Sequence, residues 1–142
     1  RLDGTPPLPQ AADGALLPAP GVTVGERDIS LLLQAKAAIA AGIATLLRRE
    51  GVAAADVRTL HLAGGFGLHL DIGNAIACGL LPGFRPEQVE LVGNTSLGGA
   101  VLALCDRALP ARLEALARAV GVIELNLDPE FEMCYIEQMS LP

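Results

Sequence analysis

The sequence predicts an α/β domain in which helices pack on a mixed sheet. Segments with helical spacing of apolar residues alternate with short segments of strand-like character, which is the pattern of this fold class. The 142 residues are enough for one compact unit and too few for two ordinary ones. Because 51% of the residues are hydrophobic and only 3% are aromatic, we expect a core of Ala, Leu, Val and Ile in which backbones approach closely.

The first twenty residues differ from the rest. Residues 1–20 hold five of the ten prolines and predict a linker or an irregular arm. The domain is expected to occupy 21–142 and to begin with a short strand at 21–24. Arg1 in place of an initiator Met, together with this proline-rich start, suggests a piece cut from a longer protein.

The most regular segment is a long helix near 28–50. Its Leu, Ile and Ala residues recur at helical spacing, with Asp28 as the expected N-cap and Gly51 as the terminating residue. Residues 57–63 alternate apolar and polar side chains as a strand does, and we expect the long helix to pack on the sheet that contains them.

The remaining elements are predicted from caps, prolines and short apolar runs. In chain order they are a helix at 71–82 begun by Asp71, a strand at 89–93, a helix after Asn94 or Thr95, a helix at 110–120 with Pro110 in its first turn, a strand at 122–127, and a final helix begun by Asp128 and Pro129.

Charge and hydropathy exclude several classes of protein. A net charge of −6 with ten scattered Lys and Arg residues argues against a nucleic-acid surface. Lys36, Arg48 and glycines interrupt the apolar runs before the roughly 20 residues that a membrane span needs. The start of the chain lacks the pattern of a secretory signal. We therefore expect a cytoplasmic protein without a membrane segment.

The cysteines do not form a ligand set. Cys78, Cys105 and Cys134 are widely separated and none belongs to a CxxC pair. Metal and cluster sites need closely spaced ligands, so the sequence predicts buried free thiols.

Two strand-to-helix junctions are rich in glycine. They are "LHLAGGFG" at 60–67 and "LVGNTSLGG" at 91–99. Glycine lets a backbone approach a flat or anionic ligand, a helix N-terminus offers free N–H donors, and ligands of open α/β sheets bind at the carboxyl ends of strands. A nucleotide is the predicted ligand. The alternative is a tight turn or close helix packing, since neither junction matches a phosphate loop or a dinucleotide fingerprint.

Several polar side chains leave two interpretations open. Asp71 is either a helix cap or a water-mediated metal ligand, and His61 and His69 are either satisfied polar groups or bases. Lys36 either reaches a ribose or phosphate or extends its ammonium to solvent along an apolar surface. Ser96 has no His and Asp pattern around it that would make it a nucleophile.

Three motifs in order resemble a known family. They are "LAGGFGLHLDIGNAIACGLLP", "VGNTSLGGAVLAL" and "LDPEFEMCYIEQMSLP", and the helix "ERDISLLLQAKAAIAAGI" fits the same pattern. Over 21–142 the chain resembles the C-terminal region of the reductive activators of corrinoid proteins, which are ferredoxin-linked members of the ASKHA, or actin-like ATPase, superfamily.

The resemblance implies a ribonuclease-H-like ATPase lobe that binds ATP with Mg²⁺. It implies a corrinoid protein of a methyltransferase system as partner, whose cob(II)alamin is returned to cob(I)alamin. The phosphate-gripping lobe and the two-iron cluster would lie in N-terminal domains, so no catalytic residue or metal ligand is assigned here and the chain alone is expected to be inactive. By resemblance, the nucleotide-binding residues are Gly64, Gly65, Phe66, Gly67, Gln34 and Lys36. The alternative is a protein-interaction module, for a homodimer or for docking of the corrinoid protein.

Overall fold

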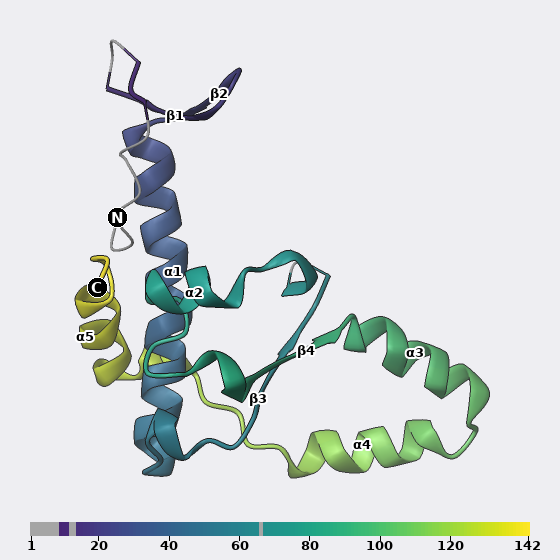
Figure 1. The fold of residues 1–142 in the computed structure, drawn as a ribbon. Coiled ribbons are helices and arrows are strands. Elements are labelled where there is room, and N and C mark those ends of the chain that lie inside the picture. The colour runs from purple at the N-terminus through teal and green to yellow at the C-terminus, as the bar shows by residue number, and fades with distance from the viewer. Residues whose placement is uncertain (1–8, 12–13, 66) are drawn as a thin grey trace.

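The computed structural model describes residues 9–11, 14–65 and 67–142. The fold is a mixture of helices and small sheets, as Figure 1 shows. Its strands are β1 (Leu16–Ala19), β2 (Val22–Val24), β3 (Leu60–Ala63) and β4 (Val89–Gly93). Its α-helices are α1 (Glu26–Glu50), α2 (Ile72–Ala77), α3 (Thr95–Cys105), α4 (Leu109–Ala119) and α5 (Pro129–Glu137). Short 3₁₀ turns are η1 (Ala54–Asp56), η2 (Gly67–His69), η3 (Pro86–Gln88) and η4 (Leu125–Leu127).

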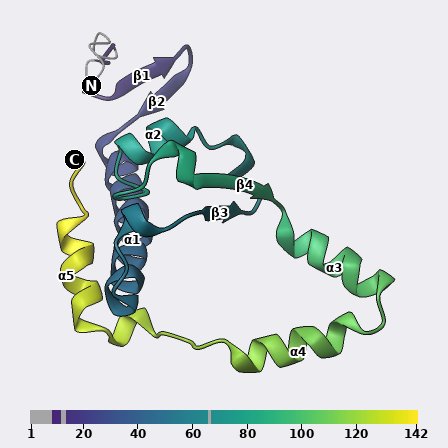
Figure 2. The same cartoon turned by 60° about the horizontal axis from the view of Figure 1, so that its bottom comes forward.

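The long helix α1 is the axis of the molecule. Helix α5 lies along one side of it, while α2, β3 and β4 lie on another side (Figures 1 and 2). Helices α3 and α4 form an arm that extends away from this body and returns to it through η4. The chain therefore has a packed part around α1 and a projecting helical hairpin.

Helix α1 starts two residues earlier than expected. Gly25 is its N-cap, and Asp28 lies in the first turn, where its Oδ2 accepts a hydrogen bond from the Gly25 N–H at 2.9 Å. The expectation that Asp28 is the N-cap is therefore wrong, although its carboxylate still satisfies a backbone donor of the helix start. Gly51 ends the helix in a left-handed conformation with φ +65°, as predicted.

Small residues let α1 and α5 approach. The buried side of α1 carries Ala37, Ala40 and Ala41, all with no exposed surface, and Gly42, against which the Leu125 side chain packs. On α5 the Cys134 side chain is almost completely buried. The alanine-built core that the composition predicts is therefore found along this helix pair.

Thr45 lies on the same buried side of α1. It has no exposed surface, and its Oγ1 has no hydrogen-bond partner among the described residues. A buried hydroxyl without a partner costs about 1–3 kcal/mol. We expect Thr45→Val, which keeps the shape, to raise the free energy of unfolding by about 1 kcal/mol in chemical denaturation. Thr45→Ser is the control: it keeps the hydroxyl, loses a methyl group and should lower stability. Equal or lower stability of Thr45→Val would show that the hydroxyl is satisfied in solution.

The strands form two separate sheets of two strands each, so the described residues do not form the single mixed sheet that was expected. Strands β1 and β2 pair antiparallel, so irregular structure is the wrong expectation for 16–19. Strands β3 and β4 pair parallel, with Leu60 opposite Val89 and Leu62 opposite Leu91. The predicted strand at 89–93 is confirmed, and the one at 57–63 is shorter, beginning at Leu60.

One apolar cluster joins α1, α2 and the parallel sheet. Its buried centre is Ala75, Leu81 and Phe84. Partly buried side chains of α1, β3, β4 and the intervening segments pack around it, including Ile43, Leu47, Leu60 and Val89. Helix α1 and the sheet that contains the 57–63 strand therefore contribute side chains to one apolar cluster, whose buried centre comes from α2 and the segment after it.

Two predicted elements end differently in the structure. Helix α2 stops at Ala77, because Gly79 adopts φ +80° and the Leu80 N–H turns back to the Ala75 carbonyl at 2.9 Å; the expected extension to Pro82 is wrong. The predicted strand at 122–127 is also wrong. This segment pairs with no strand and ends in η4, whose Leu125 packs on α1.

The arm exposes apolar side chains. Neither α3 nor α4 has a buried residue, and Leu104 is 88% exposed. Cys105 at the end of α3 is exposed as well, so the prediction of buried thiols is wrong there. It is confirmed for Cys134, whereas Cys78 is half-buried.

Helix α1 is long and apolar enough to cross a membrane by length and composition, with a mean hydropathy of 1.7 over an 18-residue window. The expectation that charges interrupt every apolar run too early is therefore wrong for this helix, in which Lys36 is the one charge between Asp28 and Arg48. Core helices of soluble proteins pass the same test. Length and composition by themselves therefore assign α1 neither to a membrane nor to the core of a soluble protein. In this structure α1 packs along α5 and buries its Lys36.

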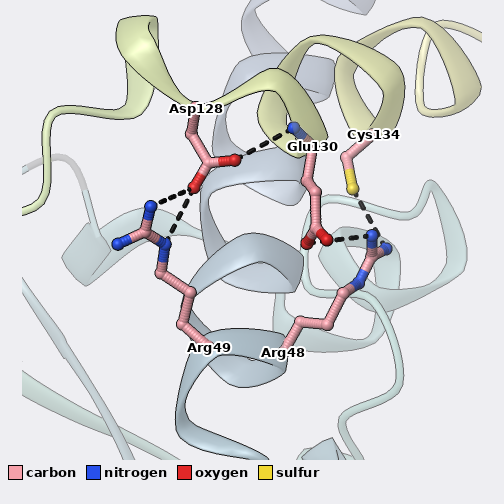
Figure 3. Close-up of polar contacts among 5 residues, drawn as sticks. All are labelled: Arg48, Arg49, Asp128, Glu130 and Cys134. Carbon is pink, nitrogen blue, oxygen red and sulfur yellow. Dashed lines mark hydrogen bonds and ion pairs between the residues drawn. The ribbon is translucent and has the colours of Figure 1, made fainter.

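A polar clamp joins the end of α1 to the start of α5 (Figure 3). The buried Asp128 caps α5 by accepting the Glu130 N–H at 2.9 Å, as predicted, and its Oδ2 accepts from Arg49 Nε and Nη2 at 2.8 and 2.7 Å. Arg48 lies beside Glu130 at 3.6 Å and donates to the Cys134 sulfur at 3.1 Å. The clamp places two arginines of the last turn of α1 on the N-terminal turn of α5.

The clamp predicts an acid-sensitive stability. Burial raises the pKa of Asp128, but hydrogen bonds from the Glu130 N–H and from Arg49, with the Arg49 charge, outweigh it and leave this pKa below its ordinary value. A carboxylate with a lowered folded-state pKa stabilises the fold above its unfolded-state pKa, and this contribution is lost as the pH falls through the folded-state value.

We expect Asp128→Asn, which keeps a capping oxygen, to lower the melting temperature at pH 7. The difference from the unmodified protein should shrink below about pH 4, where the carboxylate takes up a proton. Thermal melts between pH 3 and pH 8 measure this. Asp128→Ala, which also removes the cap, should melt lower than Asp128→Asn throughout. A melting difference for Asp128→Asn that does not change with pH would contradict the charge-pair explanation.

Candidate functional site

The parallel pairing of β3 and β4 brings the two glycine junctions to one edge of the sheet. The carboxyl ends of parallel strands lie at the same edge, and here the Gly64 N–H donates to the Gly93 carbonyl at 2.8 Å. Ala63 and Gly93 are neighbours in the register, which shifts just before them. The two junctions that the sequence singled out are thus adjacent, as expected for the edge where open α/β sheets bind ligands.

The glycines of the first junction differ in what they do. Gly64 has φ +113°, a conformation that side chains disfavour. Gly65 is exposed, its φ is ordinary, and an added Cβ would meet no atom within 4 Å. Gly67 is buried, and a Cβ there would lie 3.3 Å from Leu62 Cγ, so this glycine serves close packing. Phe66, the fourth predicted residue of this motif, lies outside the described residues.

The second junction ends in the N-terminus of α3. The Asn94 Oδ1 accepts the Leu97 N–H at 3.0 Å, which confirms Asn94 as the cap. The amides of Thr95 and Ser96 belong to the first turn, where helical N–H groups have no partner within the helix. The positive end of the α3 dipole therefore lies at the same sheet edge as Gly64. Ser96 has no described hydrogen bond to a histidine or carboxylate side chain.

The other polar residues near the sheet have structural partners. Asp71 Oδ1 accepts the Asn74 N–H at 2.8 Å, which confirms the helix cap, and no group of three metal-binding side chains occurs among the residues that the structure describes. His61 lies opposite Glu90 on the exposed face of the sheet, with Nδ1 3.3 Å from the carboxylate. His69 is exposed in η2.

The side chains of Gln34 and Lys36 have different hydrogen-bond partners in this structure. Gln34 is exposed and donates to the Ser30 hydroxyl at 3.3 Å. Lys36 is only 4% exposed, and its Nζ donates to the backbone carbonyls of Gln138 and Ser140, both at 2.8 Å. Residues two apart in a helix point in different directions. The ammonium of Lys36 thus neither extends to solvent, as one interpretation held, nor is free to reach a ribose or phosphate while these bonds persist.

Two glycines within the quoted motifs have turn roles that the sequence did not assign to them. Gly93 has φ +71° and turns β4 into the cap of α3, and Gly79 has φ +80° and ends α2. Each had a local signal: Gly93 directly precedes an N-cap residue, and Gly79 follows a short helix and precedes leucines.

A hollow of the described surface lies elsewhere. It is an open depression of about 390 Å³ along η4 and the start of α5, bordered by Leu127, Asp128, Phe131 and Tyr135 among others. It contains none of the residues of the glycine junctions. The carboxylate of Asp128 in this depression already accepts hydrogen bonds from Arg49 and the Glu130 N–H.

Comparisons with known proteins agree on one family. The model of the family described as the C-terminal domain of RACo, the ASKHA domain, matches residues 12–142. The corrinoid activation enzyme RamQ of Eubacterium limosum is 32% identical over 115 residues, which are 81% of this chain and 19% of RamQ. The Co(II) methylated amine-specific corrinoid protein reductase of Methanosarcina barkeri is 32% identical over 90 residues, which are 63% of this chain and 16% of that protein.

A solved structure has the same fold. The reductive activator for corrinoid, iron-sulfur protein matches 95% of this chain with a TM-score of 0.80 and 31% identity. The match covers 23% of that protein. The chain therefore spans about a fifth of the length of the relatives that it matches.

Proposed function

This chain belongs to the family of the C-terminal ASKHA domain of RACo, and from this premise we propose that it supplies one lobe of the ATP site of a reductive activator of corrinoid proteins. The observation that supports the proposal best is the juxtaposition of two glycine junctions at the carboxyl ends of β3 and β4. Relatives with this region are a corrinoid activation enzyme and a corrinoid protein reductase. On this proposal the domain is a ribonuclease-H-like lobe of a cytoplasmic protein.

The residues of the glycine junctions have chemistry that suits a nucleoside. Gly65 presents exposed backbone with open space where a side chain would be, so a flat base or a ribose can lie directly against it. Gly64 and Gly93 hold the two turns together through one backbone hydrogen bond. We assign no catalytic residue and no Mg²⁺ ligand to this chain, and place both in the other lobe.

In the proposed activity ATP supplies free energy for an unfavourable electron transfer. One electron from a reduced two-iron cluster in another domain converts cob(II)alamin of the corrinoid partner to cob(I)alamin. The contribution of this chain is to bind and orient the nucleotide, through the backbone of Gly64 and Gly65 and the elements that fix it.

Calorimetry with ATP and Mg²⁺ tests the proposal. We expect the intact protein to bind ATP with one site per chain, and to reduce the cob(II)alamin of its corrinoid partner, followed by absorbance, only when ATP is present. This chain produced alone should bind ATP weakly, because it provides one side of the cleft. Absence of ATP binding by the intact protein, with its iron-sulfur cluster in place, would refute the proposal.

The exposed arm favours a second candidate function, a protein-interaction module. Leu102 and Leu104 of α3 and Leu116 of α4 are largely exposed, and neither helix has a buried residue, so apolar surface on the arm is available for contact with another protein. A homodimer or a docked corrinoid protein would cover it. A thermal shift with ATP and Mg²⁺ supports the first candidate, whereas concentration-dependent sedimentation without any thermal shift supports the second.

A further inference from the structure

The end of the chain is attached to the middle of α1 by one buried lysine. We call residues 138–142, which follow α5, the C-terminal strap. Lys36 Nζ donates to the Gln138 and Ser140 carbonyls at 2.8 Å, across more than 100 residues of sequence. Two backbone bonds to one ammonium hold the strap on α1.

The environment of this ammonium is unusual. No carboxylate of the described residues lies within ion-pair distance of Lys36, although the side chain is almost completely buried. A buried charge is tolerated when hydrogen bonds replace its hydration, and the C-terminal end of a helix carries a partial negative charge. Gln138 is the C-cap of α5, so the lysine lies at the favourable end of that helix.

The strap also contacts the end of α2. At the buried Gly79 an added Cβ would lie 3.0 Å from Pro142 Cγ and 3.1 Å from both Cε and Nζ of Lys36. The turn that terminates α2 is therefore pressed against both the lysine and the last residue of the strap. Three segments meet at this point: the middle of α1, the end of α2 and the strap.

Helix α2 is the first α-helix after the glycine junction at 60–67. It is connected to Gly65 through η2, and its Ala75 belongs to the apolar cluster that includes Leu60 of β3. Movement of α2 would therefore be transmitted to the strand and the turn that lead to Gly64 and Gly65.

We propose that the C-terminal strap, held by Lys36, locks the end of α2 and makes Lys36 a positioning residue for the glycine junction, without contact to the nucleotide. The first part stands on the contacts among Lys36, Gly79 and the strap. The second part rests on the proposed function.

Hydrogen exchange in the intact protein tests the lock. The Gly79 and Leu80 amides, bonded to the Ile76 and Ala75 carbonyls, report on the end of α2. In Lys36→Met we expect the Gly79 and Leu80 amides to exchange at least about tenfold faster. The exchange of the Val52 amide, just after the C-terminal end of α1, should be unchanged. Gln34→Met, an exposed change on the same helix, should affect none of them.

A second variant keeps the test valid if Lys36→Met fails to fold. Removal of residues 139–142 takes away the Ser140 carbonyl and the Pro142 contact but leaves the lysine in place. It should accelerate exchange at Gly79 and Leu80 in the same way. Unchanged exchange at these two amides in either folded variant would overturn the lock.

The positioning role is tested by ATP affinity with a control for lost stability. Asp128→Ala loosens the same pair of helices at the other end of α5, because Asp128 is the N-cap of this helix whereas the strap follows its C-cap Gln138. We expect Lys36→Met to raise the Kd for ATP–Mg²⁺ at least about threefold and Asp128→Ala to leave it unchanged. Equal Kd values for the two variants would overturn the positioning role. If Gly65→Val also leaves the Kd unchanged, the proposed function fails, and the exchange data still decide the lock.

Discussion

Gly65→Val is expected to raise the Kd of the intact protein for ATP–Mg²⁺ by at least about tenfold, which is roughly 1.4 kcal/mol of binding free energy. The valine side chain would occupy the open space beside the Gly65 backbone, where we place the base or ribose. Because the φ of Gly65 is not left-handed and no atom lies within 4 Å of an added Cβ, the substitution fits the folded chain. Lost affinity would therefore report on the volume of the ligand. Calorimetric titration measures the Kd.

Gly121→Val is the matched control for Gly65→Val. Gly121 is also exposed, has an ordinary φ and has open space around an added Cβ, but it follows α4, in the segment that leads to η4, and belongs to neither glycine junction. It should bind ATP as the unmodified protein does. An unchanged Kd in a folded Gly65→Val protein with its iron-sulfur cluster intact would mean that the double glycine is only a packing turn.

Gly79→Ala is expected to lower the free energy of unfolding by about 2–5 kcal/mol. A left-handed conformation costs an alanine about 1–2 kcal/mol, and Gly79 has φ +80°. The added methyl group would also lie within 3.1 Å of Pro142 and Lys36 atoms, and overpacking of this kind typically costs a further 1–3 kcal/mol. Chemical denaturation measures the sum.

Gly51→Ala separates the two costs. Gly51 ends α1 with φ +65°, but no atom lies within 4 Å of its added Cβ, so only the conformational cost applies. The difference between the two variants isolates the contact with Lys36 and Pro142. Removal of Pro142 should reduce the effect of Gly79→Ala and leave that of Gly51→Ala unchanged. Equal destabilisation by the two substitutions would contradict the close contact at Gly79.

Local signals predicted most of the helices. Asp71, Asn94 and Asp128 cap α2, α3 and α5 as expected, and Gly51 ends α1. These features depend on residues within one helical turn, so the sequence contains all that is needed to find them. The three motifs in order were likewise enough to identify the family, which the comparisons confirm.

The errors arose where a partner distant in sequence decides the outcome. The apolar run at 122–127 has strand-like composition, but it pairs with no strand among the described residues, and Leu125 packs on Gly42 of α1 instead. Cys105 was assigned to the core by residue type, yet it lies on a helix that has no buried residue. Burial depends on which surfaces meet, and composition does not specify that.

At the candidate site, the two glycine junctions and the order of their strands follow from local sequence, because turns and periodicity are properties of neighbouring residues. The parallel pairing of β3 and β4, which brings both junctions to one edge, and the bonds from Lys36 to the Gln138 and Ser140 carbonyls depend on how distant segments pack. A lysine on an alanine-rich helix has the same local sequence whether its ammonium meets solvent, a ligand or a backbone. Its environment is set by the free energy of burying that charge against segments more than 100 residues away.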